Sequence, residues 1–315
     1  MSHPQTPGAG TGRLGERFVR EGLLTPAQVD AIVQLQGTAR IRFGEAALRL
    51  GLLTQDQLMS VLSEQFNYAT ASAVDPAISP LLAIARQPFG AEAESVRQLR
   101  ATVAMRLLSG GRDHASITVT SPDAQEGKSY VAASLAVAFS QNGQRTLLVN
   151  GNLRPSGQTD LFGLAGGPST DVASARHGGL STLLARLTST SQIVSVPGFP
   201  NLDVLPAGPQ PPNPLELLAE PRLRQTLDAF GREYALLVID TPAALASSDA
   251  SLIARQTDTC LLIGRKDRTR VRALRDAEAQ LRAAGADLLG AVYCTLPGDA
   301  GRPARRRWPW SRSPR

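Results

Sequence analysis

The chain has 315 residues, of which 42% are hydrophobic, and it carries 33 lysine and arginine residues against 27 acids. Its formal charge of +6 comes from residues 302–315, which hold six arginines and no acid. Because the rest of the chain is neutral, the charge gives no reason to expect a nucleic-acid partner. No apolar run approaches the length of a membrane helix and the first residues are polar, so we expect a cytoplasmic protein.

An internal repeat opens the chain after a leader, 1–12, which we expect to be disordered. Residues 13–36 are matched by residues 42–65, with the same order of apolar and polar positions. Two helical hairpins of this length can share one small core. The sequence therefore predicts an all-α domain over 13–68.

Each copy of the repeat carries signals for a helix end followed by a helix start. A short helix ends at a glycine, Gly22 or Gly51, and a threonine, Thr25 or Thr54, then caps a second amphipathic helix. The pattern is lost over 69–88 in Ala, Ser and Pro, which indicates a linker.

Strand-like and helical stretches alternate over the second domain, which we expect at 89–297. Apolar runs without polar alternation are typical of strands buried on both faces of a sheet. The sequence predicts strands at 116–120, 145–150, 202–206, 235–240, 259–264 and 288–295, and helices at 129–142, 214–230 and 270–284. This order indicates an α/β domain with a mostly parallel sheet and helices on both faces. Cys260 and Cys294 lie in two of these strands and are expected to be buried thiols.

A candidate phosphate-binding loop follows the first of these strands. In Ser116-Ile-Thr-Val-Thr-Ser-Pro-Asp-Ala-Gln-Glu-Gly-Lys-Ser129, the lysine is one of two in the whole chain. In such a loop backbone N–H groups and the next helix hold the phosphates, a lysine reaches the terminal phosphates, and a hydroxyl holds Mg²⁺. Pro122 stands where the general pattern has its first glycine. The nucleotide-binding candidates are Ser121, Asp123, Gln125, Glu126, Gly127, Lys128, Ser129 and Tyr130.

The strand at 235–240 ends in an acid, Asp240. Alone, such a residue would be read as an ordinary cap of a turn. After a phosphate-binding loop, it is better placed to organise Mg²⁺ together with Ser129. The domain is therefore expected to be of the P-loop NTPase type and to bind ATP with Mg²⁺.

Several motifs then resemble those of a known family. They are Ser121-Pro-Asp-Ala-Gln-Glu-Gly-Lys-Ser129, Leu147-Leu-Val-Asn-Gly-Asn-Leu-Arg154, Pro206-Ala-Gly208 with Pro212-Asn-Pro-Leu-Glu-Leu-Leu218, and Val238-Ile-Asp-Thr-Pro242. Over residues 88–296 the chain resembles the bacterial tyrosine autokinases of exopolysaccharide synthesis, in particular EpsG-like chain-length-determinant kinases. The resemblance implies a kinase recruited to the inner face of the inner membrane by a membrane chain-length-determinant protein.

The same resemblance implies roles for individual residues. Lys128 would neutralise the phosphates, Ser129 and Asp240 would hold Mg²⁺, and a tyrosine hydroxyl would attack the γ-phosphate. The family also uses a Glu-x-x-Arg-x-x-Arg helix for subunit contact, which implies a homo-oligomer. The matching residues lie at spacings of three along one helical face, where internal ion pairs are the alternative. They are Glu94, Arg97 and Arg100.

The chain departs from the family at its second acidic motif. The family has Asp-x-Asp-x-x-Arg there, whose carboxylates organise Mg²⁺ and help to deprotonate the acceptor, whereas this chain has Asn150 and Asn152 as its catalytic candidates. Loss of a positioned general base costs about 10²–10⁴ in rate, while phosphate binding need not suffer. In addition, the tail lacks tyrosine, and Cys294 stands where relatives usually place an adenine-contacting asparagine. An impaired kinase acting as a nucleotide-dependent assembly switch is therefore an alternative, and a positioning ATPase of the ParA/MinD type is another.

The repeat at 13–65 resembles the tandem motif of the cyclic-di-GMP-binding domain of secretion and pilus ATPases. An arginine can pair with phosphate or stack on guanine, and a helix start offers free N–H groups. The alternative is a helical docking module without the ligand. The candidate residues are Arg13, Leu14, Gly15, Gln36, Arg42, Phe43, Gly44 and Gln65.

The tail at 298–315 is rich in Pro, Gly and Arg and is expected to be disordered. Its segment Arg305-Arg-Arg-Trp-Pro-Trp-Ser-Arg312 combines cations with tryptophans. Such a segment can contact an anionic membrane surface, although solvated disorder is the commoner state of a chain end.

Overall fold

The computed structural model describes residues 11–39, 41–54, 57–58, 61, 78–88, 90–108, 112–154, 161–163, 178–186, 193–219 and 221–296. Most of the expected leader, Gln65, positions 69–77 of the expected linker and the basic tail lie outside these residues. Within the described ranges, no helix combines the length and apolar character needed to cross a bilayer.

The helical repeats form α1 (Thr11–Arg20), α2 (Pro26–Ala39) and α3 (Phe43–Arg49). After α1 and α3 the chain passes through Gly22 and Gly51, whose φ angles of +72° and +65° lie in the left-handed region that glycine adopts without a Cβ penalty. The predicted ends of both first helices are confirmed.

The predicted threonine caps are reciprocal. Gln28 Oε1 accepts a hydrogen bond from the Thr25 backbone N–H at 2.8 Å, and Thr25 Oγ1 accepts one from the Gln28 N–H at 3.3 Å. Thr54 and Gln57 make the same pair at 2.9 and 3.2 Å. Each pair satisfies two backbone donors that a helix start leaves free, so both copies begin their second helix by the same mechanism.

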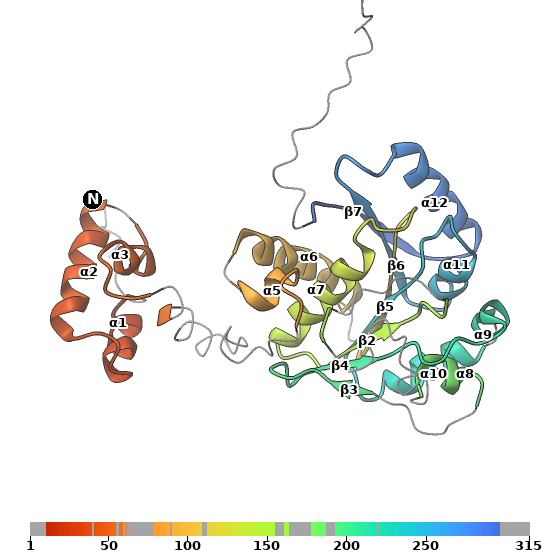
Figure 1. The fold of residues 1–315 in the computed structure, drawn as a ribbon, viewed down its shortest axis with the longest axis horizontal. Coiled ribbons are helices and arrows are strands. Elements are labelled where there is room, and N and C mark those ends of the chain that lie inside the picture. The colour runs from red at the N-terminus through yellow and green to blue at the C-terminus, as the bar shows by residue number, and fades with distance from the viewer. Residues whose placement is uncertain are drawn as a thin grey trace, which may run out of the picture.

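The described strands of the second domain form one seven-stranded sheet in the order β3-β4-β2-β5-β1-β6-β7 (Figure 1). Neighbouring strands in it are parallel, except for β3 and β4, which are antiparallel. The strands are β1 (Ala115–Thr120), β2 (Thr146–Asn150), β3 (Val194–Ser195), β4 (Leu202–Leu205), β5 (Leu236–Asp240), β6 (Thr259–Arg265) and β7 (Leu288–Cys294). All six predicted strands and the α/β class are confirmed; β3 was missed because two exposed residues carry no apolar run.

Helices cover both faces of this sheet (Figure 1). Side chains alternate along a strand, so Val238 and Ile239 of β5 belong to different apolar clusters. The cluster of Val238 includes α5 (Ala83–Arg86), α6 (Ala91–Leu107) and α7 (Lys128–Gln141). The opposite face carries α8 (Leu180–Leu184), α9 (Pro214–Ala219), α10 (Arg222–Phe230), α11 (Asp249–Ala254) and α12 (Val271–Ala283).

Two expectations about this domain need correction. The second half of the predicted linker belongs to the domain, because Ile78 and Leu82 are fully buried in the same cluster as α7. The single helix predicted at 214–230 is divided into α9 and α10 next to Pro221, whose ring and missing N–H interrupt helical hydrogen bonding.

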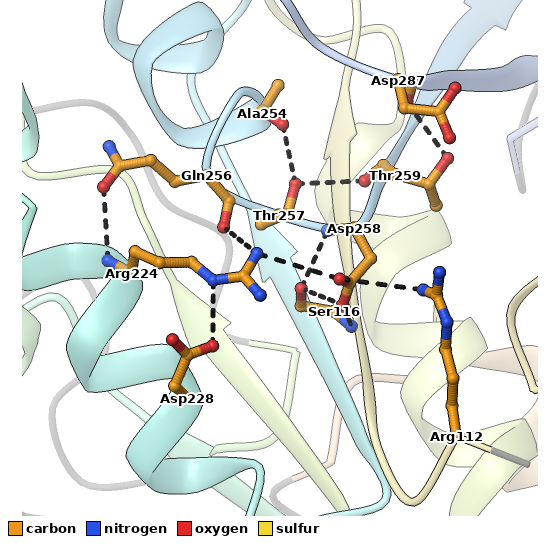
Figure 2. A network of polar contacts seen from close by, with 10 residues as sticks. All are labelled: Arg112, Ser116, Arg224, Asp228, Ala254, Gln256, Thr257, Asp258, Thr259 and Asp287. Carbon is orange, nitrogen blue, oxygen red and sulfur yellow. Dashed lines mark hydrogen bonds and ion pairs between the residues drawn. The ribbon is translucent and has the colours of Figure 1, made fainter.

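A polar network joins the amino ends of β1 and β6 (Figure 2). Asp258 Oδ2 accepts hydrogen bonds from the Ser116 backbone N–H and from its hydroxyl, both at 2.7 Å. Arg112 and Arg224 each place a guanidinium nitrogen 3.8 Å from Asp258 Oδ1. Because the strands are parallel, this network lies at the end of the sheet opposite to the phosphate-binding loop, where it joins the start of β1 to the residue before β6.

Candidate nucleotide-binding site

The loop 121–127 leaves the carboxyl end of β1 and leads directly into α7. In parallel α/β sheets, ligands bind at this edge. Gly127 has a φ of +95°, and a Cβ there would lie 2.9 Å from Leu296 Cδ2 and 3.2 Å from Cys294 Sγ. Glycine is therefore required at this position both by the backbone and by the side chains packed against it.

Hydrogen bonds within the loop fix its shape. Ser121 Oγ donates to the carbonyl oxygen of Asp123 at 2.6 Å. The carboxylate of Glu126, which is 1% exposed, accepts from the Asp123 backbone N–H at 2.9 Å. Glu126 thus accepts a hydrogen bond within the loop itself. The groups left to contact phosphates are backbone N–H groups and Lys128.

The turn that follows β6 supports the loop from one side. Arg265 Nη1 donates to the carbonyl oxygen of Gln125 at 2.9 Å, and Arg268 Nη2 donates to Gln125 Oε1 at 3.2 Å. Thr269 Oγ1 donates to Glu126 Oε1 at 2.5 Å. These contacts hold Gln125 in a left-handed conformation, with φ +61°, that residues other than glycine seldom adopt.

Lys128, Ser129 and Asp240 meet at the base of the loop. Burial raises the pKa of Asp240, and the Lys128 ammonium and a hydrogen bond from Ser129 oppose that rise. Asp240 Oδ1 is buried and has no hydrogen-bond partner among the described residues. A buried carboxylate oxygen without a partner is costly, so this atom fits a cation ligand.

The residues present fit Mg²⁺ held jointly with a nucleotide. No cluster of three or more His, Cys, Asp or Glu side chains able to hold a metal occurs in the described ranges. Mg²⁺ needs no such cluster, because it usually binds one or two protein oxygens together with substrate phosphates and water. Ser129 and Asp240 can supply those protein oxygens.

Asn150 and Asn152 lie beside this group at the end of β2. Asn150 is in register with Asp240 on β5, and the Gly151 N–H donates to the Asp240 carbonyl oxygen at 2.8 Å. Asn150 Oδ1 accepts from the Asn152 N–H at 3.1 Å, and Asn152 Oδ1 accepts from the Arg154 N–H at 3.2 Å. The two amides therefore shape two successive turns next to the metal position.

A bidentate ion pair anchors these turns. Arg154 Nε and Nη2 donate to Asp249 Oδ2 and Oδ1 at 2.7 and 3.0 Å, and this contact raises the pKa of the arginine. Asp249 is fully buried at the start of α11. The segment 150–154 is thereby fixed to the helix that follows the Asp240 loop.

Sequence reasoning missed Asp249, Arg265, Arg268 and Thr269. The Arg265 contact with Gln125 spans 140 positions and depends on the pairing of β1 with β6. No local spacing signals such a contact. Arg154 lies in the motif Leu147–Arg154 identified from the sequence, whereas its partner Asp249 lies in no such motif.

Tyr130 and Cys294 lie beside the loop. Tyr130 is half-buried against the core. Burial is the main cause that raises the pKa of Tyr130, and the Glu92 carboxylate is the second. Cys294 Sγ donates to the Glu126 carbonyl oxygen at 3.4 Å. Cys294 was expected to be fully buried but is half-exposed, because β7 is the edge strand of the sheet. Cys260, on β6, is buried as predicted.

The three candidate oligomerisation residues lie on α6 with different surroundings. Arg97 Nη1 lies 3.5 Å from Glu94 Oε2, and its other terminal nitrogen donates to the Pro88 carbonyl oxygen. Arg97 thus serves the packing of its own chain. Glu94 is exposed and Arg100 is half-exposed.

In the helical repeats, three of the eight cyclic-di-GMP candidates are held by close packing: Gly15, Phe43 and Gly44. Phe43 is buried and stacks on Phe18 with ring centroids 6.1 Å apart. A Cβ on Gly15 would lie 2.7 Å from Val29 Cγ1, and one on Gly44 would lie 2.9 Å from Leu58 Cδ2. Close packing therefore explains both glycines.

The remaining candidates of the repeats differ from these. Leu14 is half-buried against the core, whereas Arg42 is exposed at the N-cap of α3 and makes no capping hydrogen bond. Gln36 Oε1 is buried without a hydrogen-bond partner among the described residues. The Arg13 side chain and Gln65 lie outside what the structure describes.

Comparison with known proteins relates the chain to kinases. No protein-family model matches it. The putative tyrosine-protein kinase EpsB of Ralstonia nicotianae is 33% identical over 211 residues, which are 67% of this chain and 26% of EpsB. The putative tyrosine-protein kinase CapB of Staphylococcus aureus is 31% identical over 222 residues, which are 70% of this chain and 92% of CapB. The chain therefore spans about a quarter of EpsB and nearly all of CapB.

The solved structures agree with this relation. The kinase domain of the Escherichia coli tyrosine kinase ETK superposes with a TM-score of 0.62 and 28% identity, covering 70% of this chain and 82% of that one. The fold, the loop at the end of β1 and the match to nearly the whole of CapB are consistent with one another. The chain belongs to the bacterial tyrosine-protein kinase family.

Proposed function

We propose that this chain is an ATP-binding regulator of exopolysaccharide chain length and export, working with a membrane chain-length-determinant protein. The observation that carries the nucleotide site is the unpartnered, buried Asp240 Oδ1 beside Lys128 and Ser129. The polymer role is supported by the motifs shared with exopolysaccharide kinases. Membership of the kinase family removes the support for a positioning ATPase.

In the active form of this function, the residues of the loop would act on the phosphates of ATP. Backbone N–H groups of 125–129 would hold them, and Lys128 would neutralise their charge at the start of α7. Ser129 and Asp240 would hold Mg²⁺, which spreads the charge of the transferred group. A tyrosine hydroxyl, from a second copy or from the partner, would attack the γ-phosphorus in line, break its bond to the bridging oxygen, release ADP and lose its proton to solvent.

A second candidate function is a nucleotide-dependent assembly switch without phosphoryl transfer. It is favoured by the amides at 150 and 152, whose acceptor oxygens are engaged in backbone turns. Neither amide can take the proton of an attacking tyrosine, and loss of such a base costs about 10²–10⁴ in rate. In this function, ATP would drive binding to the membrane partner at the inner face of the inner membrane.

One experiment separates the two functions. The purified full chain is incubated with labelled ATP, Mg²⁺ and the cytoplasmic segment of the membrane partner, and phosphotyrosine is measured. Phosphotyrosine that disappears in Lys128→Ala supports the kinase. ATP binding that disappears in Lys128→Ala, without phosphotyrosine in the parent protein, supports the switch.

Cyclic-di-GMP remains a proposed ligand of the helical repeats. It is supported by the matching caps of the two copies, the exposed Arg42 and the unpartnered Gln36 Oε1. Titration of the full chain with cyclic-di-GMP tests it. Binding that survives the combined Arg13→Ala and Arg42→Ala change would rule out these contacts, and absence of binding would leave a docking module.

Two further contacts are proposed on the same basis as the kinase function. Arg100 and Glu94 on α6 would serve subunit contact in a homo-oligomer, and sedimentation of Arg100→Ala tests this. The Arg- and Trp-rich segment at 305–312 would add contact with an anionic membrane surface. Flotation of the chain, with and without that segment, on vesicles containing anionic lipid tests the second contact.

A further inference from the structure

The two amides beside Asp240 alter the charge of the candidate nucleotide site in a way that the geometry explains. Asn150 lies opposite Asp240 on the neighbouring strand, and Asn152 is buried one turn further on. Each amide uses its oxygen to accept a backbone N–H of its own turn. An amide has one acceptor oxygen, whereas a carboxylate in the same turn would keep a second oxygen for a cation.

The charges around Asp240 already balance. Lys128 lies near Asp240, and its ammonium opposes the rise in the pKa of that carboxyl. Arg154 is paired through two hydrogen bonds with Asp249. With amides at 150 and 152, the end of β2 adds no negative charge next to the position of the phosphates.

We propose that Asn150 and Asn152 make this a metal-sparing nucleotide site, one that holds a nucleoside triphosphate with little dependence on a divalent cation. The inference rests on the proposed binding of ATP at the Lys128 loop. Carboxylates at both positions would repel the triphosphate. A divalent cation between the carboxylates and the phosphates would then be needed to cancel that repulsion. Two like unit charges about 6 Å apart, at an effective dielectric constant of about 20, change a binding constant by about 100-fold.

As a consequence, nucleotide binding depends little on a bound cation. Asp240 remains the carboxylate that holds Mg²⁺, so the ion can still bind when present. Its departure, however, leaves the phosphates facing Lys128, the backbone N–H groups, two neutral amides and one carboxylate, Asp240, instead of three carboxylates. Bound nucleotide would then persist through exchange of the cation, as an assembly signal requires.

Titration calorimetry with ATP tests this, in magnesium buffer and again in EDTA. The proteins are the parent chain, the double variant Asn150→Asp with Asn152→Asp, and Asn142→Asp as a control. Asn142 is exposed at the C-cap of α7, at the opposite end of the helix that begins with Lys128. EDTA should weaken ATP binding to the parent and to the control by less than about tenfold, and to the double variant by at least about tenfold more.

Each outcome distinguishes the inference from the proposed function. If EDTA weakens the parent and the double variant equally, the amides do not set the metal dependence and the inference is wrong. If the parent binds no ATP even with Mg²⁺, the nucleotide site is refuted and the inference fails with it. Should the double variant not fold by circular dichroism, the single change Asn152→Asp gives the same comparison with one added charge.

Discussion

Replacing Arg154 by alanine should destabilise the α/β domain, because the change strands a buried charge. Asp249 is 0% exposed, and its two oxygens accept hydrogen bonds from Arg154 at 2.7 and 3.0 Å. Removing one partner of a fully buried pair costs roughly 3–5 kcal/mol. The Arg154 side chain is 39% exposed, so water entering after truncation recovers part of that cost. We expect a loss of about 2 kcal/mol.

Urea unfolding followed by circular dichroism measures this loss. A matched control is Arg272→Ala, which removes a surface pair with Asp276 on α12, where the two atoms are 3.8 Å apart. Such exposed pairs contribute almost nothing, so the control should unfold like the parent. The double change Arg154→Ala with Asp249→Asn should recover part of the loss, because a buried amide is less costly than a buried charge. Equal midpoints for Arg154→Ala and Arg272→Ala would refute the reasoning.

Two further changes test other parts of the site, and a third tests the packing at the start of α8. Burial raises the pKa of Asp240, so its ionisation costs stability as the pH rises through that pKa; Asp240→Asn should raise the melting temperature of the nucleotide-free protein at neutral pH, and the gain should vanish below the ordinary range of aspartate. Thr269→Val should weaken ATP binding by about threefold to tenfold through the loss of its bond to Glu126, while Thr269→Ser keeps the affinity; equal calorimetric affinities would contradict this. Gly179→Ala should cost about 2 to 3 kcal/mol in urea unfolding, since its Cβ would lie 2.4 Å from Gly208 N; an unchanged midpoint would show that the backbone there can shift.

The parts of the fold that could be predicted are those with a local pattern. The central strands are apolar on both faces, so each gives a continuous run, and the cap at Thr25 repeats at Thr54 with the same spacing. Lys128 and Asp240 could be found in the same way, because Asp240 is the last residue of such a strand and Lys128 follows the loop after another. Parallel pairing then brings them together, as Val119 and Asp240 in register on β1 and β5 show.

The parts that could not be predicted depend on contacts across the fold. The linker expected over 69–88 is rich in Ala and Pro, and nothing local distinguishes Ile78 from a linker residue. What distinguishes Ile78 is its burial, together with Leu82, in the core of the α/β domain. In the same way, Gln125 was identified as a nucleotide-binding candidate, but its left-handed backbone depends on Arg265 and Arg268 from a distant turn. Tertiary contacts override local preference at such places.

The segment 150–154 and the loop 241–248 are joined to each other at both ends. This connection links the stability of the domain to ligand binding. The Gly151 N–H donates to the Asp240 carbonyl oxygen at 2.8 Å, and Arg154 holds Asp249 at the far end of the loop 241–248. A cation or phosphate that moves Asp240 must therefore also strain the segment 150–154. Loss of the ion pair between Arg154 and Asp249 should release one of these two connections. Arg154→Ala should consequently bind ATP more weakly in calorimetry as well as unfold earlier, while Arg272→Ala changes neither property. If affinity is kept while stability falls, the ion pair supports the fold alone and the two loops respond independently.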